Sequence, residues 1–190
     1  MKTMLPIAMS DIHVHLTREH VETLFGNGHT LTKWRDLTIP GAYACREAVE
    51  VRGPMGSIAG AVVVGPPRSY TQVEISFTNA SVLGITPPLR ESGDLEASPG
   101  AVLVGTAGEL SLPKGVIAAR RHIHRSADDA REFGVADGQK VRIRVPGERA
   151  LVFENVVIRV EPEWALEMHI DLDEGRAAGV VDFQLVELIQ

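Results

Sequence analysis

The sequence has one cysteine, few aromatic residues and no long basic or hydrophobic run, and each absence excludes a class of protein. With Cys45 alone no intrachain disulfide can form, which is typical of the reducing cytoplasm. The net charge of −6 argues against nucleic-acid binding. The apolar segment from Met4 to Met9 is too short to span a membrane, and Asp11 follows it closely. We therefore expect a cytoplasmic protein that binds no nucleic acid and crosses no membrane.

What the 190 residues do contain is a 44% hydrophobic content, enough for a core, together with 18 glycines and 11 prolines that indicate frequent turns. Short stretches of apolar residues between these turns predict a mostly β chain. The predicted strands are 11–16, 49–52, 58–64, 72–76, 102–104, 110–112, 116–124, 141–145, 156–160 and 165–171. The predicted helices are 17–26, 78–83, 126–134 and 173–178, and 87–100 is predicted to be a loop.

Two His-x-His motifs carry most of the functional information. They are His13 with His15, and His122 with His124, each at a predicted strand that runs into a short helix. In a strand, residues i and i+2 face the same side with their Cα atoms about 6.6 Å apart, so both imidazoles can reach one metal ion. A single such pair is more often structural. A second pair in an equivalent place favours metal binding.

The sequence around these motifs repeats. A residue able to cap a helix follows each pair, Thr17 in the first half and Ser126 in the second. Further on, Glu74 and His169 occupy equivalent positions in two later strands, and the helices after those strands both end at glycine. Three matches in one order indicate an internal repeat.

The repeat predicts the architecture. We expect a mostly β fold of two β-barrel-like halves, residues 1–100 and 101–190, capped by short helices. The boundary is approximate, and the pattern is compatible with halves that interlock.

The repeat also predicts a third ligand for each pair. Imidazole nitrogen and carboxylate oxygen both bind zinc, and catalytic zinc sites keep one position open for water or substrate. We therefore predict two zinc ions per chain. The predicted ligands are His13, His15 and Glu74 in the first half, and His122, His124 and His169 in the second.

The other histidines and the cysteine are assigned no role in this chemistry. His20 and His29 are expected at the surface. Cys45 is expected to be a small core residue, because no catalytic motif surrounds it.

Several arginines near the motifs are candidates for anion binding, because a guanidinium fork matches phosphate and carboxylate. Arg68 precedes the strand of Glu74, and Arg90 lies in a predicted loop. Arg120 and Arg121 precede the second histidine pair. By the two-residue period of a strand, only Arg120 shares the face of those histidines.

Two other classes of metal protein resemble the first motif alone. The Asp11-x-His13-x-His15 string occurs in metal-dependent amidohydrolases, but those need a barrel of roughly 250 residues, and they leave the second pair unexplained. A cupin motif would use Glu19 as well, yet Glu19 falls in the first turn of a predicted helix.

Five segments carry a resemblance to a known family. They are His-Val-His-Leu at 13–16, Thr-Gln-Val-Glu-Ile-Ser at 71–76, Arg-Glu-Ser-Gly-Asp at 90–94, Ala-Arg-Arg-His-Ile-His at 119–124 and Leu-Glu-Met-His-Ile-Asp at 166–171. Together they resemble the phosphate propanoyltransferases, which are phosphotransacylases associated with bacterial microcompartments. The resemblance runs from about Ser10 to Ala178, nearly the whole chain.

The resemblance implies a fold of two β-barrels capped by short helices, with a dizinc site between them. The metal ligands of the family fall on the six residues that the repeat selects. Its phosphate-handling arginine falls on Arg68, and its coenzyme A lies near Ser10 and Asp11.

The resemblance further implies a zinc-dependent phosphate acyltransferase that interconverts propanoyl-CoA or acetyl-CoA plus phosphate with acyl phosphate plus coenzyme A. No serine or cysteine nucleophile with a matched base is evident, so we expect phosphate to attack directly. Two alternatives stay open: a zinc-dependent hydrolase of amidohydrolase or thioesterase type, and a non-catalytic, zinc-stabilised microcompartment component.

The sequence also departs from the family in places that affect substrate contacts. Asp11 stands where Asn is frequent, Phe77 where Arg or a polar residue is expected, and Asn79 where Asp is expected. About nine residues precede the first motif, so we expect no N-terminal encapsulation extension. Expected partners are microcompartment shell proteins, pathway enzymes or a second copy of this chain. The acyl chain, the oligomeric state and the division of ligands between two metals stay open.

Overall fold

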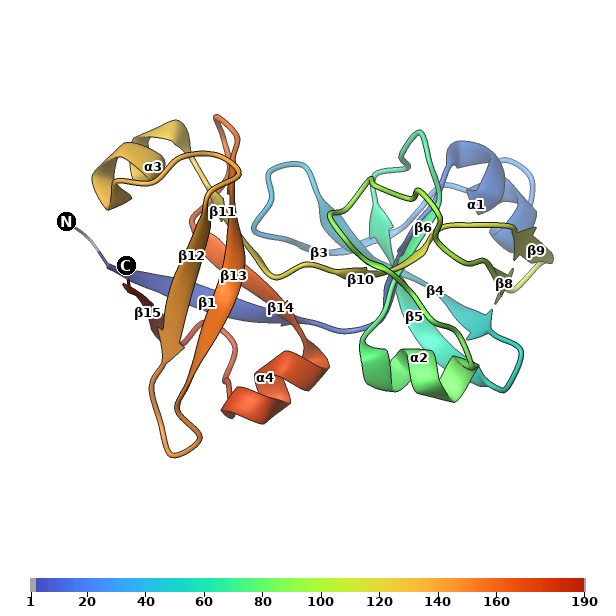
Figure 1. Ribbon diagram of the computed structural model, residues 1–190. Coiled ribbons are helices and arrows are strands. Elements are labelled where there is room, and N and C mark those ends of the chain that lie inside the picture. The colour runs from blue at the N-terminus through green and yellow to red at the C-terminus, as the bar shows by residue number, and fades with distance from the viewer. Residues whose placement is uncertain (1–2, 190) are drawn as a thin grey trace. The chain divides into compact units, whose positions relative to one another are not determined.

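The computed structural model describes residues 3–189 and forms two compact units (Figure 1). The first, here called the barrel unit, contains the N-terminal segment that ends at Ser10, Thr38–Pro40, and the chain from Arg120 onward. The second, the open-sheet unit, contains Asp11–Leu37 and Gly41–Ala119. Neither unit is contiguous along the chain, because the segment that ends at Ser10 groups with the chain from Arg120 onward.

The barrel unit is a closed barrel of six strands in the order β1-β14-β11-β13-β12-β15. The strands are β1 (Met4–Ser10), β11 (His122–Arg125), β12 (Lys140–Val145), β13 (Leu151–Val160), β14 (Glu167–Asp171) and β15 (Leu185–Ile189). Its helices are α3 (Ala127–Phe133) and α4 (Leu172–Ala178).

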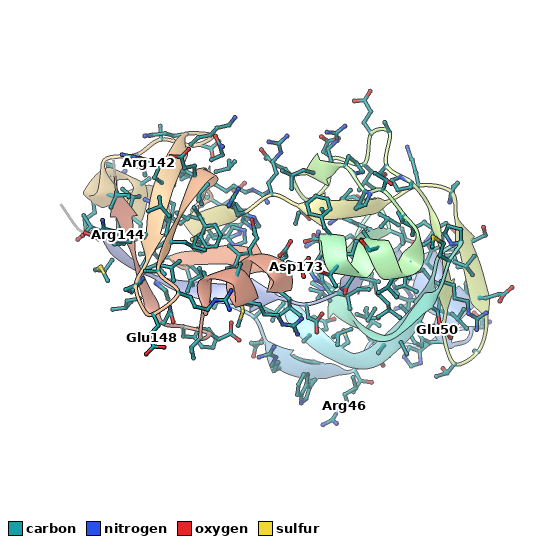
Figure 2. The ribbon with its side chains drawn as sticks, turned by 60° about the horizontal axis from the view of Figure 1, so that its bottom comes forward. Arg46, Glu50, Arg142, Arg144, Glu148 and Asp173 are labelled. Atoms are coloured by element: carbon teal, nitrogen blue, oxygen red, sulfur yellow. The ribbon has the colours of Figure 1, made fainter. Side chains whose placement is uncertain are left out.

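Strand β12 shows why this sequence closes around a core. Its residues alternate between exposed and buried, so Ile143 and Val145 point inward. Arg142 and Arg144 lie on the outer side (Figure 2). Each fully buried aliphatic side chain contributes about 1.5–3 kcal/mol relative to exposure, which makes the strand's inward face a source of stability.

The open-sheet unit is built on a curved sheet in the order β7-β10-β6-β2-β5-β4-β8-β9, with β3 paired to β4. The strands are β2 (His13–His15), β3 (Lys33–Asp36), β4 (Tyr43–Arg52), β5 (Ser57–Gly65), β6 (Gln72–Glu74), β7 (Leu89–Arg90), β8 (Ala101–Val104), β9 (Glu109–Leu112) and β10 (Val116–Ala119). Its helices are α1 (Arg18–Phe25) and α2 (Phe77–Leu83).

The two sheets share one pairing pattern. Strand β2 pairs antiparallel with β6 and parallel with β5, as β11 pairs with β14 and β13. Strand β10 runs parallel to β6, as β1 does to β14. The predicted fold class is therefore confirmed: a mostly β protein of two barrel-like parts with short helices, one closed and one open.

A strand is exchanged at each crossing between the units. Strand β1 directly precedes β2 along the chain but belongs to the barrel unit, and β10 directly precedes β11 but belongs to the open-sheet unit. In Figure 1 the blue β1 accordingly lies among the orange and red strands of the barrel. The prediction of one strand over 116–124 is therefore wrong. The chain leaves one sheet at Arg120 and enters the other at His122.

The short helices begin and end as the sequence predicts. The Thr17 side chain accepts a hydrogen bond from the backbone N–H of His20 at the start of α1, and Ser126 forms a capping box with Asp129 at the start of α3. Helix α3 ends at Gly134 in the left-handed conformation that favours glycine (φ 68°). Helices α1 and α3 begin within three residues of the ends of β2 and β11. The caps therefore set where the chain turns from each histidine strand into its helix.

Four strands have no counterpart in the prediction. They are β1, β3, β7 and β15. All four residues of β3 are exposed, so it lacks the alternation that marks a half-buried strand. Among residues 3–189, no helix is both long and apolar enough to span a membrane.

Candidate metal and anion site

The first ligand set, His13, His15 and Glu74, comes together on two adjacent strands. In the register of β2 and β6, His13 lies opposite Glu74. The donor atoms of the three residues all lie within 4.8 Å of one another. His13 Nε2 is 3.5 Å from one Glu74 oxygen, and His15 Nε2 is 3.7 Å from the other. Neighbouring ligand atoms in a tetrahedral zinc shell lie about 3.3 Å apart, so this arrangement fits a zinc ion.

Backbone carbonyls orient both rings of this set. His13 Nδ1 lies 2.8 Å from the Asp11 carbonyl oxygen, and His15 Nδ1 lies 3.3 Å from that of Val64. With the proton on Nδ1, each ring donates to a carbonyl and turns Nε2 toward Glu74, as metal-binding histidines do. Burial lowers the pKa of His15, against the opposing effect of a hydrogen bond that the Glu74 carboxylate accepts. The neutral imidazole that results is the form that binds metal.

A fully buried amide holds the carboxylate of Glu74. Gln72 Nε2 donates to Glu74 Oε1 (2.5 Å) and to Ser92 Oγ (2.8 Å). Its Oε1 accepts a hydrogen bond from the backbone N–H of Gly93 at 2.8 Å. Every polar atom of this amide therefore has a partner, and the Glu74 side chain is fixed relative to the loop around Ser92.

The same loop anchors Arg68. Its guanidinium donates to Tyr70 Oη (3.1 Å) and to Ser92 Oγ (3.2 Å), and its backbone N–H donates to the Leu16 carbonyl, one residue after His15. The positive charge of Arg68 also contributes to lowering the pKa of His15. A continuous chain of contacts thus connects Arg68 through Ser92 and Gln72 to Glu74. The arrangement places an anion-binding group beside a metal-capable group.

The second ligand set, His122, His124 and His169, lies on β11 and β14. His122 is opposite His169 in the register. The ring centroids are 4.6 Å apart for His122–His124, 5.4 Å for His122–His169 and 4.6 Å for His124–His169. His122 Nδ1 lies 2.7 Å from the Arg120 carbonyl oxygen. His13 Nδ1 makes the equivalent contact with the carbonyl oxygen of Asp11, also two residues earlier in the chain. The anchoring of the first histidine is therefore repeated.

The second set is less converged than the first. Within residues 3–189, only the first set brings three donor atoms within 4.8 Å of one another. His124 also packs on Trp164, with ring centroids 4.2 Å apart. His169 Nε2 lies 3.0 Å from Glu167 Oε2, which also accepts a hydrogen bond from the Thr38 hydroxyl at 2.5 Å. Burial acts to raise the pKa of Glu167, but these two hydrogen bonds outweigh it and lower the pKa.

The remaining histidines, His20 and His29, are partly exposed and have side-chain partners. His20 is half-buried, and its Nδ1 lies 2.6 Å from Thr71 Oγ1, which also accepts from the backbone N–H of Thr17. His29 is half-buried with Nε2 2.8 Å from Glu47. Both side chains remain partly exposed, as expected of surface residues, and each contacts a neighbouring segment of its own unit.

The other candidate side chains have local partners. Arg90 forms an ion pair with Asp94 at 3.4 Å, so its charge is already compensated within its own loop. The backbone carbonyl of Arg120 contacts the ring of His122. Cys45 is buried as predicted, and burial raises the pKa of its thiol to about 11. The thiol is therefore protonated at neutral pH.

The two residues expected near coenzyme A lie at the first crossing between units. Ser10 is the last residue of β1 and pairs with Asp171 of β14. Asp11 is exposed and accepts a hydrogen bond from the backbone N–H of Ile12. Their role toward coenzyme A stays a prediction.

Residues that the sequence analysis did not select also take part in these clusters, among them Gln72, Glu167 and Ser92. Gln72 and Glu167 each lie two residues before a predicted ligand, so the two-residue period of a strand places them on the ligand face. That signal was available in the sequence. The contact of Ser92 with Arg68 depends on a loop conformation, for which the sequence carries no comparable signal.

Comparison with known proteins gives a consistent result. Residues 6–181 match the family model described as Phosphate propanoyltransferase. A protein of that name from Thermotoga maritima is 48% identical over 97% of this chain and 88% of its own length. The proteins of the same name from Clostridioides difficile and Priestia megaterium are 46% and 51% identical, over 98% and 91% of this chain and 89% and 80% of their own lengths.

Proposed function

This chain belongs to the phosphate propanoyltransferase family of acyltransferases, and from that premise we propose a zinc-dependent reaction that interconverts a short acyl-CoA and phosphate with acyl phosphate and coenzyme A. The substrate is propanoyl-CoA or acetyl-CoA. The observation that carries the proposal is the chain of contacts from Arg68 through Ser92 and Gln72 to Glu74. Association with a bacterial microcompartment stays a prediction.

The donor chemistry of each ligand set fits zinc. In the first set, two anchored imidazoles and one carboxylate supply three ligands, which leaves a fourth position for substrate. The second set, His122, His124 and His169, is proposed to hold a second ion. Bound zinc would supply positive charge for the thioester carbonyl oxygen and for the leaving thiolate sulfur.

Arg68 is proposed to hold the phosphate. A guanidinium binds phosphate through two parallel hydrogen bonds, and Tyr70 and Ser92 fix the orientation of this one. An oxygen of hydrogenphosphate attacks the thioester carbonyl carbon, and the carbon–sulfur bond breaks. The electron pair leaves with sulfur, which receives the proton of the hydrogenphosphate. Holding the attacking oxygen in place removes much of the entropic barrier.

An acyl-enzyme route through cysteine has no support. Cys45 is the only cysteine in the sequence, and its buried thiol has a pKa of about 11. A thiolate is needed for nucleophilic attack, so this side chain is a poor nucleophile. Direct attack by phosphate accounts for the reaction without a covalent enzyme intermediate.

The test is thiol release from acetyl-CoA and propanoyl-CoA, with and without phosphate, alongside metal analysis. Arg68→Ala is expected to abolish phosphate-dependent release and to leave the metal content unchanged. Arg46→Ala is the matched control, because Arg46 is an exposed arginine of the same unit (Figure 2). Near-normal activity of Arg68→Ala would remove Arg68 from the mechanism. Release without phosphate would identify a hydrolase, and metal binding without turnover would identify a non-catalytic component.

A further inference from the structure

The turn that follows helix α1 contains the only Asn-Gly dipeptide of the sequence, Asn27-Gly28. The two residues lie between Gly26 and His29, and the backbone N–H of His29 donates to the Gly26 carbonyl oxygen at 3.1 Å. Gly28 has a φ of 74°, as at the third position of a type II turn, where glycine is favoured. Asn27 and Gly28 therefore form the tip of a four-residue turn.

The two chemical groups at this tip are unrestrained. Asn27 and Gly28 are both exposed. Within residues 3–189, neither the side-chain amide of Asn27 nor the backbone N–H of Gly28 has a hydrogen-bond partner. A Cβ atom on Gly28 would meet nothing within 4 Å apart from its chain neighbours, so the peptide group between the two residues has room to rotate. Local motion of the turn is therefore enough to bring the Gly28 nitrogen to the Asn27 side chain.

We infer that Asn27 is a site of spontaneous deamidation, with the backbone nitrogen of Gly28 as the nucleophile. This nitrogen attacks Cγ of Asn27 and gives up its proton. The bond from Cγ to Nδ2 breaks, and the departing amide group takes up that proton and leaves as ammonia. A cyclic succinimide remains. Water then adds to one of its two carbonyl groups and opens the ring, which yields either aspartate or isoaspartate at this position.

The Asp137-Gly138 turn of the barrel unit shows the opposite situation. Asp-Gly dipeptides close the same succinimide ring, with loss of water in place of ammonia. Here, however, the Gly138 N–H donates to the Ile158 carbonyl oxygen at 2.8 Å, and Asp137 Oδ1 accepts a hydrogen bond from the backbone N–H of Val160 at 2.9 Å. Both reacting groups are therefore tied to β13, and ring closure requires two hydrogen bonds to break first.

The other two asparagines are also hindered. Asn79 lies in α2, where the N–H of the next residue, Ala80, donates to the Ser76 carbonyl oxygen at 2.9 Å. Asn155 is followed by Val156, whose branched side chain is fully buried and crowds its own backbone nitrogen. Glycine imposes no such crowding at Asn27, so we expect this asparagine to react fastest.

Isoaspartate at this position would loosen the turn that ends α1. Its main chain runs through the side-chain carbon, so the turn gains one backbone atom and the bond from His29 N–H to the Gly26 carbonyl loses its geometry. His29 also contacts the sheet, since its Nε2 lies 2.8 Å from Glu47 of β4. The expected consequence is a less stable connection between the end of α1 and the open sheet.

The test follows the full chain during several days in warm, mildly alkaline buffer. Trypsin separates the candidate sites into different peptides, which are 19–33 for Asn27, 69–90 for Asn79, 150–159 for Asn155 and 132–140 for Asp137. Mass spectrometry detects the replacement of NH2 by OH, and methylation by an isoaspartate methyltransferase detects isoaspartate. Asn27 is expected to deamidate faster than the other asparagines by about tenfold or more, which is about 1.4 kcal/mol in activation free energy.

Asn27→Gln is the matched control, because ring closure from the longer side chain is slower and the exposed position tolerates the change. It is expected to abolish the modification of peptide 19–33. Incubation should lower the Tm of the wild-type chain by about 2–4 °C through loss of the turn hydrogen bond, and leave that of Asn27→Gln unchanged.

The outcomes that would overturn the inference are specific. No mass gain in peptide 19–33, or equal rates at all three asparagines, would remove Asn27 as a preferred site. Isoaspartate that accumulates as fast in peptide 132–140 would show that the unbonded Gly28 N–H is not the cause. Because Asn27 and Gly28 belong to neither ligand set, the result is independent of the proposed reaction.

Discussion

The open-sheet unit and the barrel unit present histidine pairs on matched backbones with different chemistry around them. In both, a short strand carries the pair, an antiparallel strand lies opposite, and a carbonyl two residues earlier holds the first ring. In the open-sheet unit a neutral amide, Gln72, orients the carboxylate of Glu74. In the barrel unit the equivalent residue is itself a carboxylate, Glu167. Backbone register has been kept while the side chains have diverged.

The surroundings of the two pairs differ as well. In the open-sheet unit, Arg68 is connected to the first ligand set through its hydrogen bond to Ser92, and its guanidinium is suited to binding phosphate. Trp164 packs on the second pair at His124. The comparison teaches that one repeated strand pairing can carry two histidine pairs with different side chains around them.

The largest expected effect comes from deleting one histidine of each pair in turn. His13→Ala and His122→Ala are each expected to lose one metal per chain and to reduce kcat/KM by about 10³-fold or more, because several kcal/mol of charge stabilisation disappear. Metal analysis and thiol-release assays on both variants check this. Full activity of His122→Ala would contradict the proposal that both histidine pairs bind a metal needed for activity, since the barrel unit would then hold no functional metal.

The next effect concerns the amide that orients Glu74. Gln72→Leu keeps the side-chain volume but removes its hydrogen bonds to Glu74 and Ser92, so the metal affinity of the first ligand set is expected to fall about 10–100-fold. Chelator competition measures it. Gln139→Leu in the barrel unit changes an exposed glutamine and serves as the control. Equal metal affinity in the Gln72 and Gln139 variants would show that Glu74 needs no support.

The pH dependence of the metal-free protein should differ between the two units. Burial lowers the pKa of His15, so the unfolded chain takes up this proton first as the pH falls. The contribution of His15 to the free energy of unfolding is therefore fully present above about pH 6.5. It is lost as the pH falls from there through the pKa that His15 has in the folded protein. Glu167 also has a lowered pKa, but its contribution is complete above about pH 4.3 and is lost only below that.

Hydrogen exchange of the metal-free protein between pH 7 and pH 5 can separate the two windows. Protection of the amides in β6 is expected to decrease in this range, and that of the amides in β14 to decrease only at lower pH. His15→Gln should remove most of the first decrease. If the decrease persists in that variant, a group other than His15 is responsible.

The smallest expected effect concerns the helix caps that follow the two histidine strands. Ser126→Ala removes the two hydrogen bonds that the Ser126 hydroxyl makes with Asp129, and Thr17→Ala removes one bond at α1. Each is expected to lower the free energy of unfolding by about 1 kcal/mol, which lowers Tm by about 2–4 °C, with the larger loss for Ser126→Ala. Denaturant and thermal unfolding measure the difference. A larger loss for Thr17→Ala would reverse the ranking.

The parts of the fold that depend on local sequence could be predicted. The helix caps and the strands with clear alternation or flanking turns are local features, and they appear close to where the sequence places them. Strand β3 could not be found, because its four residues are all exposed. The exchange of β1 and β10 could not be found either, since it depends on which distant strand each one pairs with.

The candidate site also has a part that the sequence predicts and a part that it does not. The repeat placed Glu74 beside His13 and His169 beside His122, because equivalent strand positions imply equivalent neighbours. The convergence of the first three donor atoms depends on side-chain rotamers, which the repeat does not encode. The contact between Ser92 and Arg68 depends on how a loop folds back on the sheet.

The exchanged strands make this single chain the covalent counterpart of a domain-swapped dimer. Each sheet contains a strand that precedes the histidine strand of the other unit. One copy of the repeat on its own would lack the partner strand beside β6 or β14, and it could complete its ladder only by receiving that strand from a second copy. Gene duplication and fusion would have made that exchange permanent. Two fragments cut in the loop between β7 and β8 should therefore reassemble rather than fold apart.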